Sequence, residues 1–196
     1  MEDILIESHP WEPFIPDNAR ILIMGTFPPQ SKRWNMDFYY PNRTNDFWKI
    51  MGLIFLGDKD ALLIPGKKDY DLDAIIRLMS EKGIALNDTV RKARRLKGNA
   101  SDKFLEIVET VPLFDLLAEM PECHAVATTG EKAASVVAAL THTEIPKMGE
   151  KVIAHNLHEY SPLALYRMPS TSRAYPMKLE DKAEYYRKMF EDIGII

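Results

Sequence analysis

The segment Gly25–Trp48 has the strongest chemical character in the chain, because it combines aromatic rings with carboxamides. It contains Phe27, Trp34, Phe38, Tyr39 and Tyr40, together with Asn35, Asn42 and Asn45. A loop with this content predicts a surface on which planar ligands, including nucleobases, are stacked and hydrogen-bonded. The alternative is that the rings only anchor a long loop to the body of the protein. Composition alone favours neither interpretation.

A second segment that could bind a ligand is Arg167–Tyr175, which is small, polar and stiffened by Pro169. Its backbone amides and hydroxyl groups could approach a phosphate backbone closely. For this segment in isolation, a Ser/Thr turn before the last helix is the better interpretation.

Basic residues are clustered in one stretch, although the formal net charge of −4 does not indicate a nucleic-acid-binding protein. Phosphate binding requires a basic face and not a basic whole. Taken alone, the cluster is more typical of a solvated surface. Its members are Arg91, Lys92, Arg94, Arg95 and Lys97.

Signals for other kinds of site are weak. The single cysteine, Cys123, excludes an internal disulfide and a multi-cysteine metal site. His155 and His158 have no third ligand at a suitable spacing. The turn at Thr129 lacks the second glycine and the Lys-Ser/Thr ending of a phosphate-binding loop, and no serine-hydrolase elbow is present. We therefore expect neither a metal nor a cofactor.

The elements that position these segments alternate between strands and helices. Strands are predicted at Ala19–Phe27, Gly83–Asp88, 123–129, Lys151–Leu157 and Ala164–Pro169. Helices are predicted from Phe47 with Thr44 or Asn45 as N-cap, at Leu72–Gly83, from Ser101, within Phe114–Glu122, after Gly130, and at Leu179–Ile193. The pattern predicts a single domain over residues 1–196 with three α/β/α layers and a central, mostly parallel sheet of four to five strands.

Four polar turns follow predicted strands, and this places one candidate site. They are Gly25–Pro29, Asn87–Asp88, Thr129–Glu131 and Pro169–Arg173. Ligands of open α/β sheets bind beyond the carboxyl ends of the strands. The four turns are therefore expected to meet at one edge of the sheet.

In this order and spacing, the motifs resemble the uracil-DNA glycosylase superfamily, and most closely its hypoxanthine-DNA glycosylase-like branch. The resemblance covers roughly residues 19 to 190. It is carried by GTFPP, YYPNRTNDFW, GIALND followed by VRKARR, TTGEKAA and MPSTS.

The resemblance implies a monofunctional glycosylase that hydrolyses the N-glycosidic bond of a deaminated base, hypoxanthine or uracil, in base excision repair. Asn45 matches the amide that holds the attacking water in that branch, and Gly25 and Thr26 form the first-motif turn. Superfamily members with strong uracil-excision activity carry Asp or Asn at the position of Phe27, and they carry histidine at the position of Met168. These two replacements leave open an alternative, a non-catalytic nucleic-acid-binding relative.

The remaining roles follow from the same resemblance and from the chemistry of the side chains. Phe27 or a loop tyrosine, here Tyr40, would stack on a base flipped out of the helix. Asn87 and Asp88 would read its edge, unless they are a turn residue and a helix cap. The DNA backbone would be held by Ser170, Thr171, Ser172 and Arg173, with Arg94 and Arg95.

The cellular context is also an expectation. No apolar run is long enough to span a bilayer, and the acidic N-terminus lacks the features of a signal peptide. We expect a cytoplasmic monomer whose partner is DNA that contains a deaminated base, with no membrane involvement.

Overall fold

The computed structural model describes residues 5–96, 104–155 and 162–196, and its centre is a five-stranded sheet. The strand order is β3-β2-β6-β8-β7. The four parallel strands are β2 (Ile21–Gly25), β3 (Ile84–Asp88), β6 (Ala125–Thr129) and β8 (Leu163–Met168), and β7 (Lys151–Ala154) runs antiparallel to β8. The predicted mixed α/β class with a mostly parallel sheet is confirmed.

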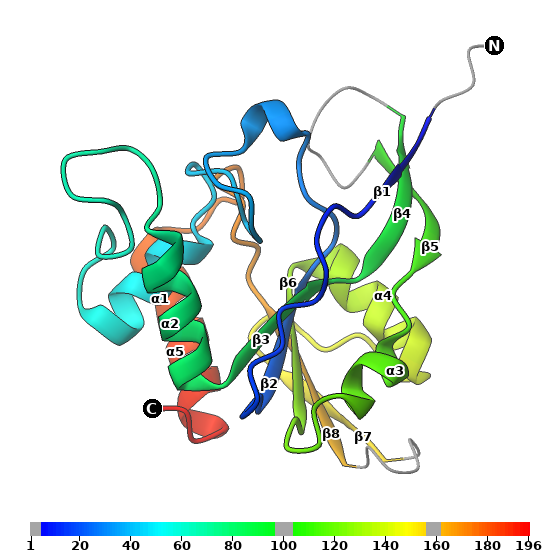
Figure 1. The fold of residues 1–196 in the computed structure, drawn as a ribbon. Coiled ribbons are helices and arrows are strands. Elements are labelled where there is room, and N and C mark those ends of the chain that lie inside the picture. The colour runs from blue at the N-terminus through cyan, green and yellow to red at the C-terminus, as the bar shows by residue number, and fades with distance from the viewer. Residues whose placement is uncertain (1–4, 97–103, 156–161) are drawn as a thin grey trace.

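Helices cover both faces of this sheet, as Figure 1 shows. One face packs against α1 (Phe47–Leu56), α2 (Leu72–Lys82) and α5 (Leu179–Asp192), and the other against α3 (Leu113–Ala118) and α4 (Glu131–Thr141). Successive residues of a strand face opposite sides. Ile21 and Ile23 accordingly belong to the first core and Leu22 and Met24 to the second. Burial on both faces explains the continuous apolar run of β2.

A smaller antiparallel sheet contains β1 (Ile6–Ser8), β4 (Val90–Arg95) and β5 (Leu105–Thr110). The prediction of a helix from Ser101 is wrong for residues 105–110, which form β5, while Ser101 itself lies outside the described residues. Ile107 and Val108 are β-branched and favour strands, and β4 offers a pairing edge. Four members of the basic cluster, Arg91, Lys92, Arg94 and Arg95, lie on strand β4, and Lys97 lies outside the described residues.

The N-terminal strap, which we define as residues 6–16, lies along the outer edge of β3. Phe14 and Leu86 exchange backbone hydrogen bonds of 3.0 and 2.9 Å, and the His9 amide donates to the carbonyl oxygen of Arg91 at 2.8 Å. The strap therefore joins the two sheets and covers the edge strand of the larger one. No helix of the described chain is long and apolar enough to cross a membrane.

Gly83 ends α2 as the sequence indicates, and its left-handed conformation (φ 65°) admits a test. A Cβ at Gly83 would lie 2.4 Å from the carbonyl oxygen of Asn18, whereas Gly57, which ends α1 at φ 75°, has nothing within 4 Å. We expect Gly57→Ala to cost about 1 kcal/mol in the free energy of unfolding, from backbone strain alone. Gly83→Ala should lose about 1–3 kcal/mol more, because the clash is with backbone. Urea denaturation measures both, and equal losses would contradict the packing at Gly83.

Candidate functional site

The register of the sheet brings the carboxyl ends of the four parallel strands into one row. Gly25 pairs with Asp88, Met24 pairs with Thr128, and Thr129 pairs with Met168. A cleft of about 910 Å³ opens beyond this row. It is lined by residues 25–29, most of 40–45, and 170–176, together with Arg33, Asp88 and Thr129. The volume is typical of small-molecule sites, which span roughly 300–1,000 Å³.

Most of the residues selected from the sequence lie together in this cleft. Its lining includes Gly25, Thr26, Phe27, Tyr40, Asn45, Asp88, Ser170, Thr171, Ser172 and Arg173. Asn87, Arg94 and Arg95 are not among the lining residues.

The floor of the cleft is polar and is built around Gly25. A Cβ at Gly25 would lie 2.6 Å from Asp88 Oδ1 and 3.4 Å from the Tyr40 hydroxyl oxygen. The Tyr40 hydroxyl in turn lies 3.2 Å from Thr129 Oγ1, with either oxygen as donor. The absence of a side chain at Gly25 is therefore what lets Asp88, Tyr40 and Thr129 form this floor.

Tyr40 is held in an unusual conformation. Its backbone is left-handed (φ 53°), and its ring stacks on Phe47 with centroids 3.8 Å apart. Burial raises the pKa of its hydroxyl well above the ordinary value, so Tyr40 remains a neutral hydrogen-bonding group. Non-glycine residues seldom adopt positive φ, and such strain is concentrated at functional sites.

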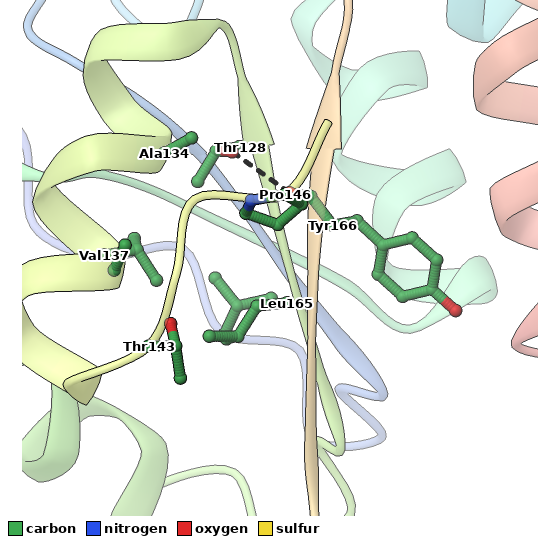
Figure 2. A pocket seen from close by; sticks show the side chains of 9 residues that line it. Thr128, Ala134, Val137, Thr143, Pro146, Leu165 and Tyr166 are labelled. Atoms are coloured by element: carbon green, nitrogen blue, oxygen red, sulfur yellow. Dashed lines mark hydrogen bonds between the residues drawn. The ribbon is translucent and has the colours of Figure 1, made fainter. Parts of the chain in front are cut away.

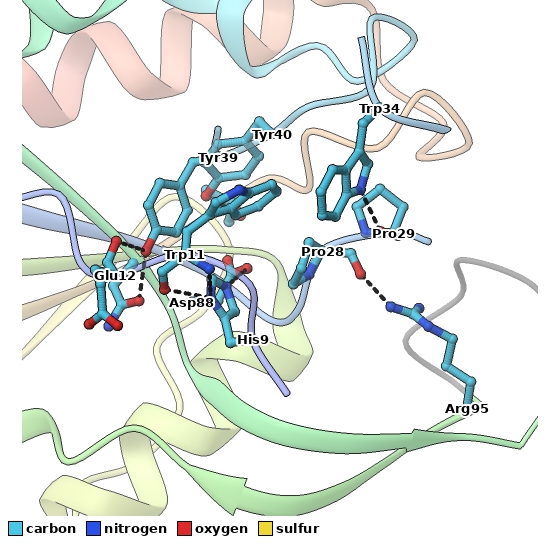
Figure 3. Close-up of polar contacts among 12 residues, drawn as sticks. His9, Trp11, Glu12, Pro28, Pro29, Trp34, Tyr39, Tyr40, Asp88 and Arg95 are labelled. Carbon is cyan, nitrogen blue, oxygen red and sulfur yellow. Dashed lines mark hydrogen bonds and ion pairs between the residues drawn. The ribbon is translucent and has the colours of Figure 1, made fainter. Parts of the chain in front are cut away.

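Asp88 is the carboxylate of the floor, and its partner is a residue that the sequence analysis did not select. His9 Nε2 lies 2.9 Å from Asp88 Oδ2, and both side chains are more than nine-tenths buried. Figure 3 shows this contact beneath the aromatic rings of the strap and loop. Asp88 caps no helix, because Val90 already begins β4. The helix-cap alternative is therefore wrong.

Asn87 is committed to internal contacts. It is 5% exposed, and the Tyr39 hydroxyl lies 3.0 Å from its Oδ1 and 3.0 Å from the carbonyl oxygen of Glu12. Burial raises the pKa of Tyr39 well above its ordinary value, so this hydroxyl keeps its proton. These two hydrogen bonds of the Tyr39 hydroxyl connect the aromatic loop to β3 and to the strap.

Arg94 and Arg95 of β4 have anionic partners within the chain. Arg95 Nε donates to Glu7 Oε1 at 2.9 Å, and the guanidinium lies over the Phe27 ring at 5.4 Å. The guanidinium also donates to the carbonyl oxygen of Pro28 (Figure 3). Its side chain is only 8% exposed. Arg94 pairs with Glu106 at 3.4 Å. Arg95 therefore stabilises the turn after β2 through its contacts with Phe27 and Pro28.

Asn45 lies where the aromatic loop enters α1. The N-cap residue of α1 is Asp46, but the Asn45 side chain makes the capping contact, with Oδ1 accepting from the Phe47 amide at 2.9 Å. A second Oδ1 lone pair and both Nδ2 protons remain for other partners. The amide is thus held in a fixed plane at the wall of the cleft.

The Asp46 carboxylate forms a buried ion pair instead of capping the helix. Lys182 Nζ donates to Asp46 Oδ2 at 2.9 Å and to the carbonyl oxygen of Ser172 at 2.8 Å. The Asp46 amide donates to the carbonyl oxygen of Thr171 at 2.8 Å. Helix α5 therefore fixes both the start of α1 and the loop after β8. Sequence reasoning missed Lys182, although its spacing from Tyr186 and Met189 places it on the apolar face of α5.

Other positions in the described chain offer less. A hollow of about 10 Å³ lies beneath α4 and is lined mainly by apolar side chains. Val137 and Leu165 are among them (Figure 2). The volume of the hollow is about the room for one water molecule. Within the described ranges, no three His, Cys, Asp or Glu side chains are grouped to hold a metal ion. His158 lies outside those ranges, and burial raises the pKa of the Cys123 thiol to about 11.

Comparison with solved structures gives an informative likeness. No protein-family model and no curated protein matches the chain. The chain is similar to the solution NMR structure of a "putative uracil DNA glycosylase" from Methanosarcina acetivorans, with a TM-score of 0.65 and 19% identity, over 97% of this chain and 99% of that one. At this identity the likeness shows a shared fold, and it supports the uracil-DNA glycosylase-like architecture indicated by the sequence.

The ion pair of Lys182 can be tested by its removal. Lys182→Met would leave the Asp46 carboxylate with only the partly exposed Lys49 ammonium, 3.4 Å from Oδ1, and we expect a loss of about 3 kcal/mol in the free energy of unfolding. Lys188→Met is the matched control, because Lys188 pairs with Glu184 on the same helix with 68% of its side chain exposed. The control should change stability by less than about 1 kcal/mol.

A double variant separates the charge effect from packing. If the penalty comes from the lost charge compensation of Asp46, Lys182→Met combined with Asp46→Asn should be less destabilised than the sum of the two single variants. Strict additivity in urea denaturation would show that the pair is not coupled.

Proposed function

We propose that the protein is a monofunctional DNA glycosylase that removes a deaminated base, hypoxanthine or uracil, by hydrolysis of its N-glycosidic bond. The observation that carries the proposal is the convergence, at the strand ends of a uracil-DNA glycosylase-like fold, of a polar floor, the Asn45 amide and the Ser170–Arg173 loop.

The cleft suits a base that has been turned out of the double helix. Such enzymes bind the extruded base by stacking and by hydrogen bonds to its edge. In this proposal Phe27 and Tyr40 supply ring surfaces, and Asp88 accepts a hydrogen bond from the base. A buried carboxylate accepts hydrogen bonds only, so the complementary edge must present an N–H group.

The proposed reaction replaces the base at C1′ by the oxygen of water. The base departs with the electrons of the C1′–N bond and takes up a proton. The water oxygen bonds to C1′ and releases a proton, which leaves an abasic sugar and a free base. Backbone N–H groups of the Gly25–Phe27 turn would stabilise the negative charge on the departing base.

Asn45 would hold the attacking water. A water that attacks a nearly free oxocarbenium ion needs orientation more than deprotonation. Because the Phe47 amide already fixes Oδ1, the rest of the carboxamide is positioned without further ordering.

The DNA backbone would be held by Ser170–Arg173, together with Arg33 on the opposite rim. Arg33 and Arg173 are exposed, line the cleft and form no ion pair with the described residues. Arg94 would have to exchange Glu106 for a phosphate group, and Arg95 would have to leave Glu7. We therefore assign those two a smaller share of phosphate binding than the sequence indicates.

A second candidate function is binding of nucleic acid without catalysis. The Phe27 side chain cannot hydrogen-bond a water molecule, and Met168 is 1% exposed within the core. Neither residue can therefore replace the polar group found at its position in enzymes with strong uracil-excision activity. Under this alternative, Asn45 is only a helix cap.

Abasic-site formation distinguishes the two candidates. Labelled duplexes with one hypoxanthine, uracil or xanthine are incubated with the protein, with and without EDTA, and are then treated with alkali. We expect cleavage at the modified position, undiminished by EDTA because no metal takes part in the proposed step. Binding without cleavage on all three duplexes would favour the second candidate, and a requirement for added metal would overturn the mechanism.

Asn45 is the residue whose substitution tests the mechanism most directly. We expect Asn45→Ala to lower single-turnover excision by roughly 100-fold or more, the scale for losing a positioning group. The lost cap should cost about 1 kcal/mol of stability. Asn45→Asp keeps an acceptor for the Phe47 amide, so it should retain stability and part of the activity.

The matched control is Asn42→Ala. Asn42 also lines the cleft, and its side chain accepts from the Thr44 amide at 2.9 Å. It should lose stability but keep most of its excision rate. An Asn45→Ala protein that is destabilised yet fully active would remove Asn45 from the mechanism.

A further inference from the structure

We propose that His9 is a positioning residue that fixes Asp88 as an obligatory hydrogen-bond acceptor and thereby limits the site to bases with an N–H group beside a carbonyl. This inference rests on the proposed glycosylase function and names the chemical class of base that the floor accepts.

The orientation of the His9 ring is fixed from several sides. Its ring stacks on Tyr39 with centroids 5.7 Å apart, and Trp11 and Phe27 meet it edge-on at 5.6 and 5.7 Å. Nδ1 lies 3.0 Å from the carbonyl oxygen of Trp11, and Nε2 lies 2.9 Å from Asp88 Oδ2. The imidazole therefore has one orientation in which both nitrogens are satisfied.

The proton arrangement makes His9 a donor to Asp88 in both charge states. In the imidazolium, Nδ1–H donates to the Trp11 carbonyl oxygen and Nε2–H donates to Asp88. In the neutral ring, Nδ1 can instead accept from the Trp11 amide at 3.3 Å, and Nε2 keeps its proton. An ionised Asp88 thus receives a donor on Oδ2 in either state.

The charges around the pair favour the imidazolium. Burial alone would lower the pKa of His9, but the hydrogen bond and the negative charge of Asp88, with a smaller contribution from Glu12, outweigh it and raise the pKa. Tyr39 faces the ring as a neutral phenol, and the Arg95 cation lies behind Phe27. The negative charge of Asp88 therefore stabilises the protonated form of His9, on the side of the carboxylate away from the cleft.

The second oxygen of Asp88 faces the floor. Oδ1 approaches Gly25, which lines the cleft, and accepts no hydrogen bond from the described residues. The Asp88 side chain is only 8% exposed, so few water molecules can compensate for a wrong partner. His9 does not line the cleft and acts through Asp88.

The base is then selected by its ring nitrogen, N1 in purines or N3 in pyrimidines, which would face Asp88 Oδ1. Adenine N1 and cytosine N3 carry a lone pair, which a buried carboxylate repels. Deamination to hypoxanthine or uracil converts that nitrogen to N–H, which Oδ1 can accept. Sites that hydrogen-bond a particular group reject analogues lacking it by roughly 10⁴-fold, because a buried polar group is left unpaired. Guanine and thymine also carry this N–H, so Asp88 separates hypoxanthine from adenine and uracil from cytosine but does not exclude guanine or thymine.

The first experiment varies the base. Single-turnover excision by the full chain is measured on duplexes that carry hypoxanthine, 1-methylhypoxanthine or unsubstituted purine. The methyl group replaces the N1 proton, and purine lacks that proton without added bulk. We expect both analogues to be removed at least roughly 100-fold more slowly than hypoxanthine. Equal rates would overturn the N–H requirement while leaving the glycosylase intact. No excision of hypoxanthine, uracil or xanthine would overturn the proposed function itself.

The second experiment varies His9. We expect His9→Leu to lower excision of hypoxanthine by roughly 10- to 100-fold and to reduce the preference over purine, with affinity for abasic-site duplex nearly unchanged. His9→Gln retains an N–H donor toward Asp88 and should restore part of both quantities. His124→Leu, at an exposed histidine, is the control.

The base preference separates positioning from stability. A merely structural role would lower the melting temperature without altering the ratio of hypoxanthine to purine excision. If His9→Leu does not fold, His9→Gln still tests the role of His9. Asp88→Asn tests the acceptor itself, because a carboxamide can donate as well as accept and should lose the preference. An unchanged ratio in the folded variants would overturn the role of His9.

Discussion

The candidate site depends on the buried ion pair between Lys182 and Asp46. Withdrawing both charges from water is costly, and the cost is offset only where the remaining hydrogen-bonding groups are satisfied. Here Lys182 also donates to the carbonyl oxygen of Ser172, and the Asp46 amide donates to that of Thr171. Asn45 precedes Asp46 in the chain. Lys182 on the last helix thus sets the distance between the proposed water-holding amide and the loop that we propose binds DNA.

The rest of the site follows from the strand register. Parallel strands that end in one row place Gly25, Asp88 and Thr129 side by side. The positions of these residues are therefore set by strand pairing and do not depend on the conformation of a loop. The Tyr40 ring reaches the same row only through a left-handed backbone, which its stacking on Phe47 stabilises. Rigid strand ends therefore carry the polar floor, and longer loops complete the walls.

The sequence was informative wherever a property is local. The apolar run of β2, the glycine after α2 and the polar turns after the strands all reflect nearby residues, and the structure places them as expected. Pairings over long separations were not readable. His9 and Asp88 are 79 residues apart, and Lys182 and Asp46 are 136 apart. Residues 105–110 became a strand because β4 supplied a partner, which no local pattern records.

The N-terminal strap has two duties that cannot be separated. It covers the edge of β3 through the Phe14–Leu86 bonds, and it carries His9 to Asp88. An uncovered edge strand invites pairing with other chains. Because short peripheral segments open more readily than the core, a molecule whose strap has detached would expose an adhesive edge and release the carboxylate in the same event. Protection against aggregation and the proposed discrimination between bases would then depend on one local opening equilibrium, which amide hydrogen exchange at Leu86 would report for both.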